Sequence, residues 1–278
     1  MITREQVVHL CKRKGKLKAQ RGIWETHWQD LTNFVLPNSA DFSLQRSKGD
    51  KRSTLIYDST GVHANEMLAA GLHGMLTNPA SNWFSLRLKS SQEEMAQQTD
   101  VKNWLEDTTT AILSEIASPA VAFPSHIHEY YLALCCIGTA CMFIGEPALR
   151  DGISFRAIHI DEIYIAESAD GIIDTVFREF KMTVRQIVQK WGEAALSPRI
   201  KRMYEKKDYD KEVELLHCVY PRDDVEKGKK AATMLPVASV YIDEKDQHVL
   251  AEGGFDEMPY MVSRWAKTTG EVFGRSPA

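Results

Sequence analysis

Apolar and polar residues recur with a helical period through the first half of the chain. Apolar positions about 3.6 residues apart predict four helices, over residues 1–37, 61–77, 100–117 and 124–142. Thr3 begins a capping pattern for the first helix, and Gly22, next to Arg21, allows a break within it. The fourth helix is predicted to be the longest and most apolar, so we expect it to be buried on several sides.

The second helix has clear start and end signals. Asp58-Ser59-Thr60-Gly61 supplies side-chain oxygens that can accept the N–H groups of a first turn, and Asn78-Pro79 stops the helix. Its apolar face, which we expect to be buried, carries Val62, Met67, Leu68, Leu72, Met75 and Leu76. The stripe expected to be buried on the third helix carries Val101, Trp104, Leu105, Ile112, Leu113 and Ile116. Trp83 and Phe84 then predict entry into a strand, with both rings in a core.

From residue 143 the period changes to that of strands. Short apolar segments predict strands over 142–146, 153–158, 163–166, 172–181, 213–220, 234–243, 249–252 and 259–264. Asp170-Gly171 suits a two-residue turn and predicts a hairpin between two of them. Two short helices are predicted between the strands, one from the Thr183 cap to Trp191 and one from Ser197-Pro198 toward Tyr204.

These elements predict an α+β fold with a helical N-terminal half and a mostly antiparallel, strand-rich second half. The chain divides accordingly into a helical part, residues 1–142, and a strand-rich part with two short helices, residues 143–278. A hydrophobic content of 44% with 26% charged residues is ordinary for a folded protein. The longest apolar run, from Tyr131 to Gly145, is shorter than the roughly 20 residues that span a bilayer, so no membrane partner is expected.

Charge is distributed unevenly. Residues 1–52 carry 11 Lys and Arg against 5 Asp and Glu, although the whole chain has a net charge of −4. The densest basic stretch lies on the first helix and comprises Lys12, Arg13, Lys14, Lys16, Lys18 and Arg21. It is the candidate for contact with nucleic acid, scaffold or a neighbouring subunit, and the alternative is a solvated helix face. A second basic cluster falls in the polar loop over residues 38–52.

Two tryptophans on the first helix form a second candidate contact. Trp24 and Trp28 are four residues apart and therefore share one helix face. Aromatic side chains anchor interfaces as well as cores. For this pair a contact between subunits and packing within the chain are nearly equal alternatives.

Candidate chemistry is weak throughout. Gly71 to Gly74 and Gly253-Gly254 do not continue into a phosphate-binding or dinucleotide-binding pattern. His126 and Glu129 provide only two metal ligands at helical spacing, and the adjacent carboxylates Asp161 and Glu162 are expected to diverge. The five cysteines show no metal-ligand spacing, and their odd number without a secretory leader fits a reducing compartment. No catalytic, cofactor-binding or metal-binding residue is therefore expected, and the chain is not predicted to be an enzyme.

The order of several segments resembles one family. The sequence IYDSTG, followed by LAAGLHGMLTNPASNWFSL, is similar to the head-to-tail connector, or portal, proteins of short-tailed phages. Other segments that fit the family include the run with Arg21, Trp24, Trp28, Leu31 and Pro37, the segment Gly138-Thr139-Ala140, Phe177-Arg178-Glu179, and the terminal Phe273-Gly274-Arg275-Ser276-Pro277. The resemblance runs through nearly the whole chain.

The resemblance implies the wing-like part of a portal subunit, with the stem, the clip and the C-terminal parts absent. It implies a ring of about twelve subunits that meets capsid, scaffold, terminase and tail proteins and through which double-stranded DNA passes. The expected location is the virion, with the host cytoplasm during assembly. A chain of this extent is expected to be a monomer or a loose oligomer that exposes apolar surface. The alternative function is a nucleic-acid-binding module that uses the basic N-terminal helix.

Overall fold

The computed structural model describes residues 2–39, 42, 56–89, 92–147, 151–222 and 235–278. Its helices are α1 (Arg4–Val35), α2 (Thr60–Leu76), α3 (Glu93–Ala96), α4 (Thr99–Ala117), α5 (Phe123–Ile137), α6 (Val184–Trp191) and α7 (Pro198–Glu205). Short 3-10 turns cover Ile160–Glu162 and Glu193–Ala195. The four predicted N-terminal helices are confirmed. Most of the polar loop over 38–52, with its basic cluster, lies outside the described residues.

Helix α1 is unbroken and begins with the predicted cap. Thr3 accepts a hydrogen bond from the backbone N–H of Gln6, whose side chain in turn accepts one from the Thr3 backbone. The helix continues through Gly22, so the break allowed there does not occur. At 32 residues α1 is the longest helix. The sequence had predicted that the fourth helix would be the longest.

The predicted fourth helix ends earlier than its apolar pattern suggests. Helix α5 stops at Ile137 because Gly138 adopts a left-handed conformation with φ of +86° and serves as its C-cap. Strand β1 (Thr139–Gly145) follows directly, so Cys141 lies in a strand and not in the helix. An uninterrupted apolar run looks the same in a buried helix and in a buried strand, which explains the error.

The second half consists of antiparallel strands, as predicted. After β1 they are β2 (Ser154–Ile158), β3 (Ile163–Glu167), β4 (Ile173–Thr183), β5 (Glu212–Pro221), β6 (Val237–Asp243), β7 (His248–Phe255) and β8 (Tyr260–Arg264). They form two sheets, one of three strands in the order β2-β1-β8 and one of five in the order β3-β4-β5-β6-β7. The strand entry predicted at Trp83 does not form, but its ring stacks on Phe123 with 5.8 Å between centroids, so the predicted core packing is confirmed.

Local signals in the second half are also confirmed. The predicted hairpin between β3 and β4 forms with Gly171 at a φ of +72°, but the strands are connected by residues 168–172 and not by a two-residue turn. Thr183 forms a capping box with Gln186 at the start of α6, and Ser197 caps α7 through the N–H of Ile200. Each of these turn and cap signals involves residues only a few positions apart, so the local structure forms without contacts between distant segments.

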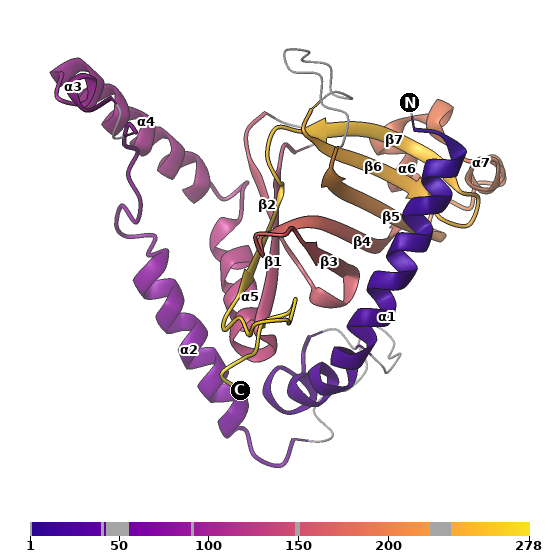
Figure 1. Cartoon of the computed structure of the whole chain (residues 1–278), viewed down its shortest axis with the longest axis horizontal. Coiled ribbons are helices and arrows are strands. Elements are labelled where there is room, and N and C mark those ends of the chain that lie inside the picture. The colour runs from indigo at the N-terminus through magenta and orange to yellow at the C-terminus, as the bar shows by residue number, and fades with distance from the viewer. Residues whose placement is uncertain (1, 40–41, 43–55, 90–91, 148–150, 223–234) are drawn as a thin grey trace.

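The larger sheet is covered on both faces. Helix α1 runs along one face (Figure 1), where Val7, Leu10 and Leu17 pack against buried residues of the sheet such as Phe177. The three-stranded sheet and helices α6 and α7 pack against other buried residues of the same strands. The predicted boundary between residues 142 and 143 falls inside β1, and one hydrophobic cluster contains Trp28 together with residues of both sheets.

Helices α2 and α4 form an arm that extends away from the sheets (Figure 1). Within α2, Asn65 and Ala69 are buried, whereas Met67 is 63% exposed and Met75 is 86% exposed. Trp104 of α4 is 62% exposed. The expected burial is therefore wrong for Met67, Leu68, Met75 and Leu76 of α2. On α4 it is wrong for Trp104 and Ile112, whereas Ile116 is buried and the other three residues of the stripe are half-buried. The face of α2 that meets α5 is the one with Ala69, and no described segment covers the opposite face.

Candidate functional site

The six basic residues singled out on α1 do not form one surface. Lys14 and Arg21 are buried and Arg13 is half-buried, whereas the remaining three are exposed. Lys12 and Lys16 point away from the side of the helix that carries Lys14, since residues two positions apart differ by about 200°. Half of the six basic residues are therefore buried or half-buried within the protein, and the other half are exposed on the surface.

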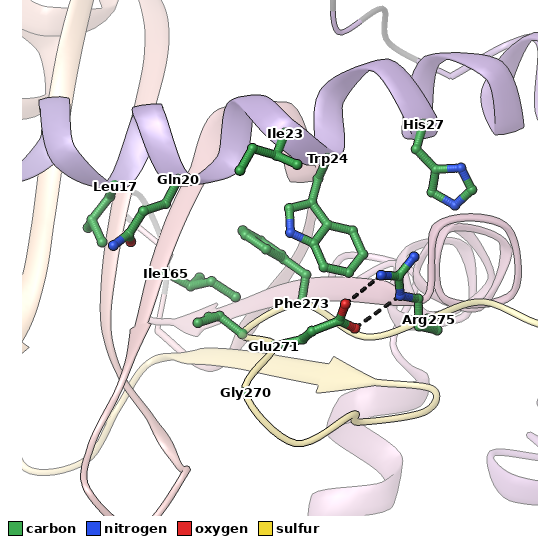
Figure 2. A pocket seen from close by; sticks show the side chains of 11 residues that line it. Leu17, Gln20, Ile23, Trp24, His27, Ile165, Gly270, Glu271, Phe273 and Arg275 are labelled. Atoms are coloured by element: carbon green, nitrogen blue, oxygen red, sulfur yellow. Dashed lines mark hydrogen bonds and ion pairs between the residues drawn. The ribbon is translucent and has the colours of Figure 1, made fainter.

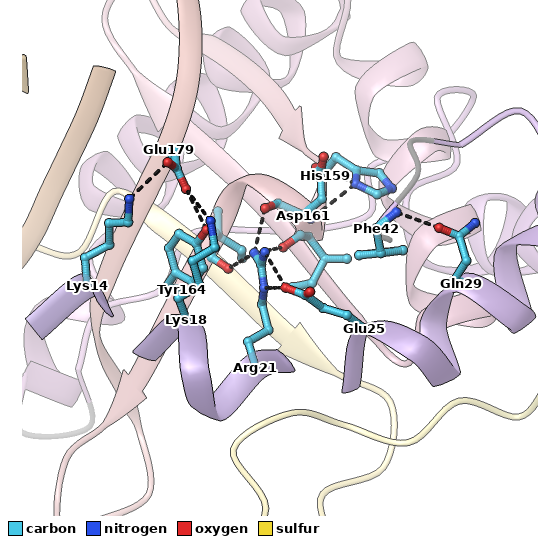
Figure 3. A network of polar contacts seen from close by, with 12 residues as sticks. Lys14, Lys18, Arg21, Glu25, Gln29, Phe42, His159, Asp161, Tyr164 and Glu179 are labelled. Carbon is cyan, nitrogen blue, oxygen red and sulfur yellow. Dashed lines mark hydrogen bonds and ion pairs between the residues drawn. The ribbon is translucent and has the colours of Figure 1, made fainter. Parts of the chain in front are cut away.

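Lys14 bridges α1 to strand β4 (Figure 3) and to the turn that follows β6. Its Nζ donates to Glu179 at 3.0 Å and to Glu244 at 2.7 Å. Burial alone would lower the pKa of Lys14, but the hydrogen bonds to Glu244 and Glu179 outweigh burial and raise it above its ordinary value. Burial raises the pKa of Glu179, and hydrogen bonds from Tyr164 and Lys14 reverse this and lower it. The ion pairs hold α1 in register on the sheet.

Arg21 caps the carbonyl groups of a turn. Its guanidinium donates to the carbonyl oxygens of Ile160 at 3.2 Å, Asp161 at 2.6 Å and Ile163 at 2.8 Å. Its Nε also donates to Glu25 at 2.9 Å on the same helix (Figure 3). These contacts occupy the guanidinium inside the protein. A phosphate group could reach Arg21 only if this set of bonds were broken.

The two tryptophans of α1 also differ in their surroundings. Trp28 is completely buried and meets Phe273 edge to face at 4.9 Å and Phe42 at 5.4 Å. Trp24 is half-buried, and the guanidinium of Arg275 lies over its ring at 4.4 Å. Trp28 is thus part of the core that joins α1 to the C-terminal segment, whereas Trp24 keeps an accessible edge.

Trp24 lines a groove between α1 and the C-terminal segment (Figure 2). The groove has a volume of about 420 Å³ and includes Ile23, which is 84% exposed, and His27 on the helix side. On the opposite side Arg275 forms an ion pair with Glu271, with its Nε 3.0 Å from a carboxylate oxygen. The groove therefore combines apolar helix side chains with a paired charge.

A serine, a histidine and an aspartate are hydrogen-bonded in series near the end of α1. The Oγ of Ser39 lies 2.5 Å from Nε2 of His159, and Nδ1 of His159 lies 2.7 Å from a carboxylate oxygen of Asp161. Sequence reasoning missed this relay, because Ser39 is 120 residues from His159 and no local motif marks the pair. Both residues line a pocket of about 170 Å³.

The geometry around Ser39 is that of a tether between two segments. In acyl-transfer enzymes with such a relay, the N–H of the nucleophilic serine stabilises the oxyanion. Here that N–H donates to the carbonyl of Leu36 at 3.0 Å. The N–H of Asp161 lies 3.2 Å from His159 Nδ1, as in a capped turn. The relay therefore ties the segment after α1 to the turn before β3.

Other candidate chemistry is accounted for by packing. Asp161 faces His159 while Glu162 accepts from Arg178 at 2.7 Å, so the adjacent carboxylates diverge as predicted. Burial raises the pKa of Cys135 to about 11, which leaves its thiol protonated and unreactive at neutral pH. Within the described residues no group of three or more His, Cys, Asp and Glu side chains could hold a metal ion. No helix in this part of the chain is long and apolar enough to span a membrane.

Comparison with known proteins identifies relatives over nearly the whole chain. Residues 8–278 match a family described as bacteriophage head to tail connecting protein. The chain is 33% identical over 270 residues to the portal protein of Salmonella phage epsilon15, covering 96% of this chain and 48% of that protein. It is 30% identical over 272 residues to a probable portal protein of Bordetella phage BPP-1, covering 97% of this chain and 48% of that protein. The chain thus spans about half the length of the curated relatives it matches.

Proposed function

The chain belongs to the family of bacteriophage head to tail connecting proteins, and on that premise we propose that it forms the N-terminal, wing-like part of a portal subunit. Portal subunits of this kind assemble into a closed ring through repeated heterologous contacts, in which two different surfaces of neighbouring copies meet. We propose a ring of about twelve copies, as the resemblance implies. The observation that carries the proposal is the family match over residues 8–278.

The exposed arm supports a role in assembly. Met67, Met75 and Trp104 place large apolar side chains on the surface of two helices that extend away from the sheets. Apolar faces of this kind on folded proteins commonly mark contacts with other chains. Trp24 and the adjacent groove provide a second surface with accessible aromatic area. Two separate surfaces are what a heterologous ring contact requires.

The proposed partners follow from the same assignment. They are further portal subunits, the capsid and scaffold proteins, terminase and the tail, with double-stranded DNA passing through the completed ring. The protein would reside in the virion and assemble in the host cytoplasm. It would act through non-covalent contacts and not as an enzyme, which agrees with the use of Ser39 and the cysteines in internal packing.

The nucleic-acid-binding alternative is less well supported. A phosphate-binding helix presents its Lys and Arg side chains to the solvent. Lys14 and Arg21 instead complete internal networks, which leaves Lys12 and Lys16 as the residues that point away from the sheet. We therefore do not assign DNA binding to this helix.

The proposal is tested on the product of the complete reading frame. We expect its particles to have the mass of a ring by mass photometry and a central channel by electron microscopy. Met67→Glu with Met75→Glu should reduce ring formation, because two charges on this apolar face oppose burial. The matched control is Gln189→Glu, which adds a charge at an exposed position of α6.

The possible outcomes test the portal assignment and the role of the α2 face separately. Rings in the parent and fewer rings in the double variant, with unchanged unfolding of the subunit, support both. Rings of equal abundance in both proteins would keep the portal assignment and remove the α2 face from the interface. A parent protein that stays monomeric under all assembly conditions would contradict the proposed function.

A further inference from the structure

Two rows of side chains face each other between the two sheets. In the three-stranded sheet the strand register aligns Arg156, Phe143 and Tyr260 in one row. In the five-stranded sheet it aligns Arg178, His217 and Tyr241 in another. Directly paired residues of antiparallel strands project to the same side of their sheet. We call these six residues, together with Lys190 of α6, the inter-sheet seam.

The centre of the inter-sheet seam is closed by direct contacts. Nδ1 of His217 lies 2.7 Å from the hydroxyl of Tyr260, and Nε2 lies 2.9 Å from the hydroxyl of Ser239. The imidazole stacks on the ring of Tyr241 with 3.9 Å between centroids and 2° between planes. Phe143 packs against Tyr260 at 5.0 Å. These contacts join the two rows and fix the aromatic rings.

His217 contributes no charge to the inter-sheet seam. Complete burial lowers its pKa well below the ordinary value, and the positive charges of Lys190 and Arg178 lower it further. Both ring nitrogens already have hydroxyl partners, so one tautomer of the neutral ring satisfies the site. The positive charge of the inter-sheet seam therefore comes from its Lys and Arg side chains.

Lys190 of α6 lies against Tyr241, while Arg156 and Arg178 each stand at one end of the two rows. Nζ of Lys190 lies over the Tyr241 ring at 4.4 Å and over the Trp191 ring at 4.8 Å. Lys190 is exposed overall, but partial desolvation of its ammonium against the two rings lowers its pKa, and the charges of Arg156 and Arg178 act in the same direction. The same two guanidinium groups also act on the hydroxyl of Tyr241. Lys190, Arg156 and Arg178 therefore contribute like charges to the inter-sheet seam from three different elements.

Carboxylates balance only part of this charge. Glu162 accepts from Arg178 at 2.7 Å. No other ion pair among the described residues involves Arg156, Arg178 or Lys190. Lys190 contacts aromatic rings and the Tyr241 hydroxyl, at 3.5 Å, and Arg156 is exposed. Within the described residues, Lys190 and Arg156 thus have no carboxylate partner, and Lys190 lies next to the phenol of Tyr241.

We propose that Arg156, Lys190 and Tyr241 form an oxyanion site that takes a phosphate group, with Arg178 behind it. A phosphate carries the charge that would relieve the repulsion between these cations. Guanidinium and ammonium groups donate several charge-assisted hydrogen bonds to its oxygens. The phosphate can be free in solution or part of a nucleic-acid backbone. The site is separate from the basic stretch of α1 and does not depend on ring assembly.

The site is tested with inorganic phosphate as the probe. Thermal unfolding of the parent, Arg156→Gln, Lys190→Gln and the double variant is followed as phosphate replaces chloride at constant ionic strength. We expect phosphate to stabilise the parent, and we expect the apparent affinity to fall at least tenfold in the double variant. Lys181→Gln, which removes an exposed charge from β4, serves as the matched control and should behave like the parent.

A second measurement follows the Lys190 side chain directly. Its ammonium should titrate at higher pH when phosphate is bound, because a bound anion favours the charged form. Nuclear magnetic resonance of the labelled lysine side chains can detect this change even if Lys190→Gln proves unstable. A Lys190 titration unchanged by saturating phosphate, or equal phosphate stabilisation of parent and double variant, would overturn the proposal.

A binding experiment with duplex DNA distinguishes a free phosphate from a phosphate of the nucleic-acid backbone. Binding of a short DNA duplex at low salt is compared between the parent and the double variant. Weaker phosphate and DNA binding in the variant would assign a site that accepts backbone phosphates. Weaker phosphate binding with unchanged DNA binding would assign a site for a free phosphate. Both results support an oxyanion site. If the double variant binds phosphate and DNA as well as the parent does, the proposal is contradicted.

Discussion

The guanidinium of Arg21 lies over the ring of Tyr164, with its central carbon 4.2 Å from the ring centre. This contact places a charged residue of the N-terminal helix against the first strand of the larger sheet, more than 140 residues further along the chain. The same guanidinium caps the carbonyl groups of the preceding turn. Arg21, which looks like a surface charge in the sequence, is therefore an internal brace between α1 and β3.

Replacing Arg21 should destabilise the protein. Arg21→Met leaves two buried carbonyl groups, the half-buried carbonyl of Asp161 and Glu25 without their donor, so we expect a loss of about 3 kcal/mol in the free energy of unfolding. Urea unfolding measures the change. The control Lys16→Met alters an exposed residue of the same helix and should stay within about 0.5 kcal/mol of the parent. Equal stability of the two variants would contradict the bracing role.

His217 should make the protein sensitive to mild acid. Its folded-state pKa is depressed by burial, so below pH 6.5 the unfolded chain binds a proton that the folded chain does not. The contribution of His217 to the free energy of unfolding is fully present above pH 6.5. It decreases as the pH falls below 6.5, with a slope approaching about 1.4 kcal/mol per pH unit. Unfolding curves between pH 7 and pH 5 measure this slope.

Two variants assign that slope to one histidine. His217→Gln should lower stability at pH 7 but flatten its dependence on pH down to about 5, because the amide does not titrate. Exposed His63→Gln should keep the parent slope. The carboxylate Glu179 adds a further loss of stability only at lower pH, since its pKa lies below the ordinary 4.5. An unchanged slope in His217→Gln would contradict the assignment.

Gly138 should not tolerate a side chain. It has a φ of +86°, and a Cβ there would lie 2.5 Å from the backbone of Arg275 and Ser276. We therefore expect Gly138→Ala to cost at least about 2 kcal/mol. Gly22→Ala is the matched control, because a Cβ there meets no atom within 4 Å. In the middle of α1, alanine should add about 0.5–1 kcal/mol of stability.

The same pair of glycines tests how the C-terminal segment is held. The N–H of Gly274 donates to the hydroxyl of Thr139 at 2.8 Å, which places this segment across the turn between α5 and β1. Gly138→Ala should therefore expose the segment to protease, whereas Gly22→Ala should not. Parent-like stability and protease resistance in Gly138→Ala would show that the segment can move aside at little cost.

Ser39 should behave as a structural residue. A fluorophosphonate probe reacts with activated serines, and we expect it to leave Ser39 unlabelled, because the N–H that would stabilise an oxyanion is bonded to Leu36. Ser39→Ala should instead lower stability by about 1 kcal/mol through loss of its bond to His159. Labelling in the parent that disappears in Ser39→Ala, detected by mass spectrometry of the peptide, would show a nucleophile.

Much of the secondary structure could be predicted from sequence because its signals are local. The Thr3 and Thr183 caps, the turn at Gly171 and the strand periods each involve residues a few positions apart. The end of α5 was placed too late because the apolar run continues without interruption into β1. Family membership was also suggested by sequence, since it rests on the order of many such local segments.

The sequence by itself determined most of the helices and strands, the α+β class and the family to which the chain belongs. The tertiary structure decided which charged and apolar side chains are accessible. Lys14 is buried because Glu179 and Glu244, 165 and 230 residues away, approach it in the folded sheet. Met67 and Met75 stay exposed because the opposite face of α2 packs on α5. Burial depends on contacts between distant segments, and a periodic pattern specifies an apolar face without specifying what covers it.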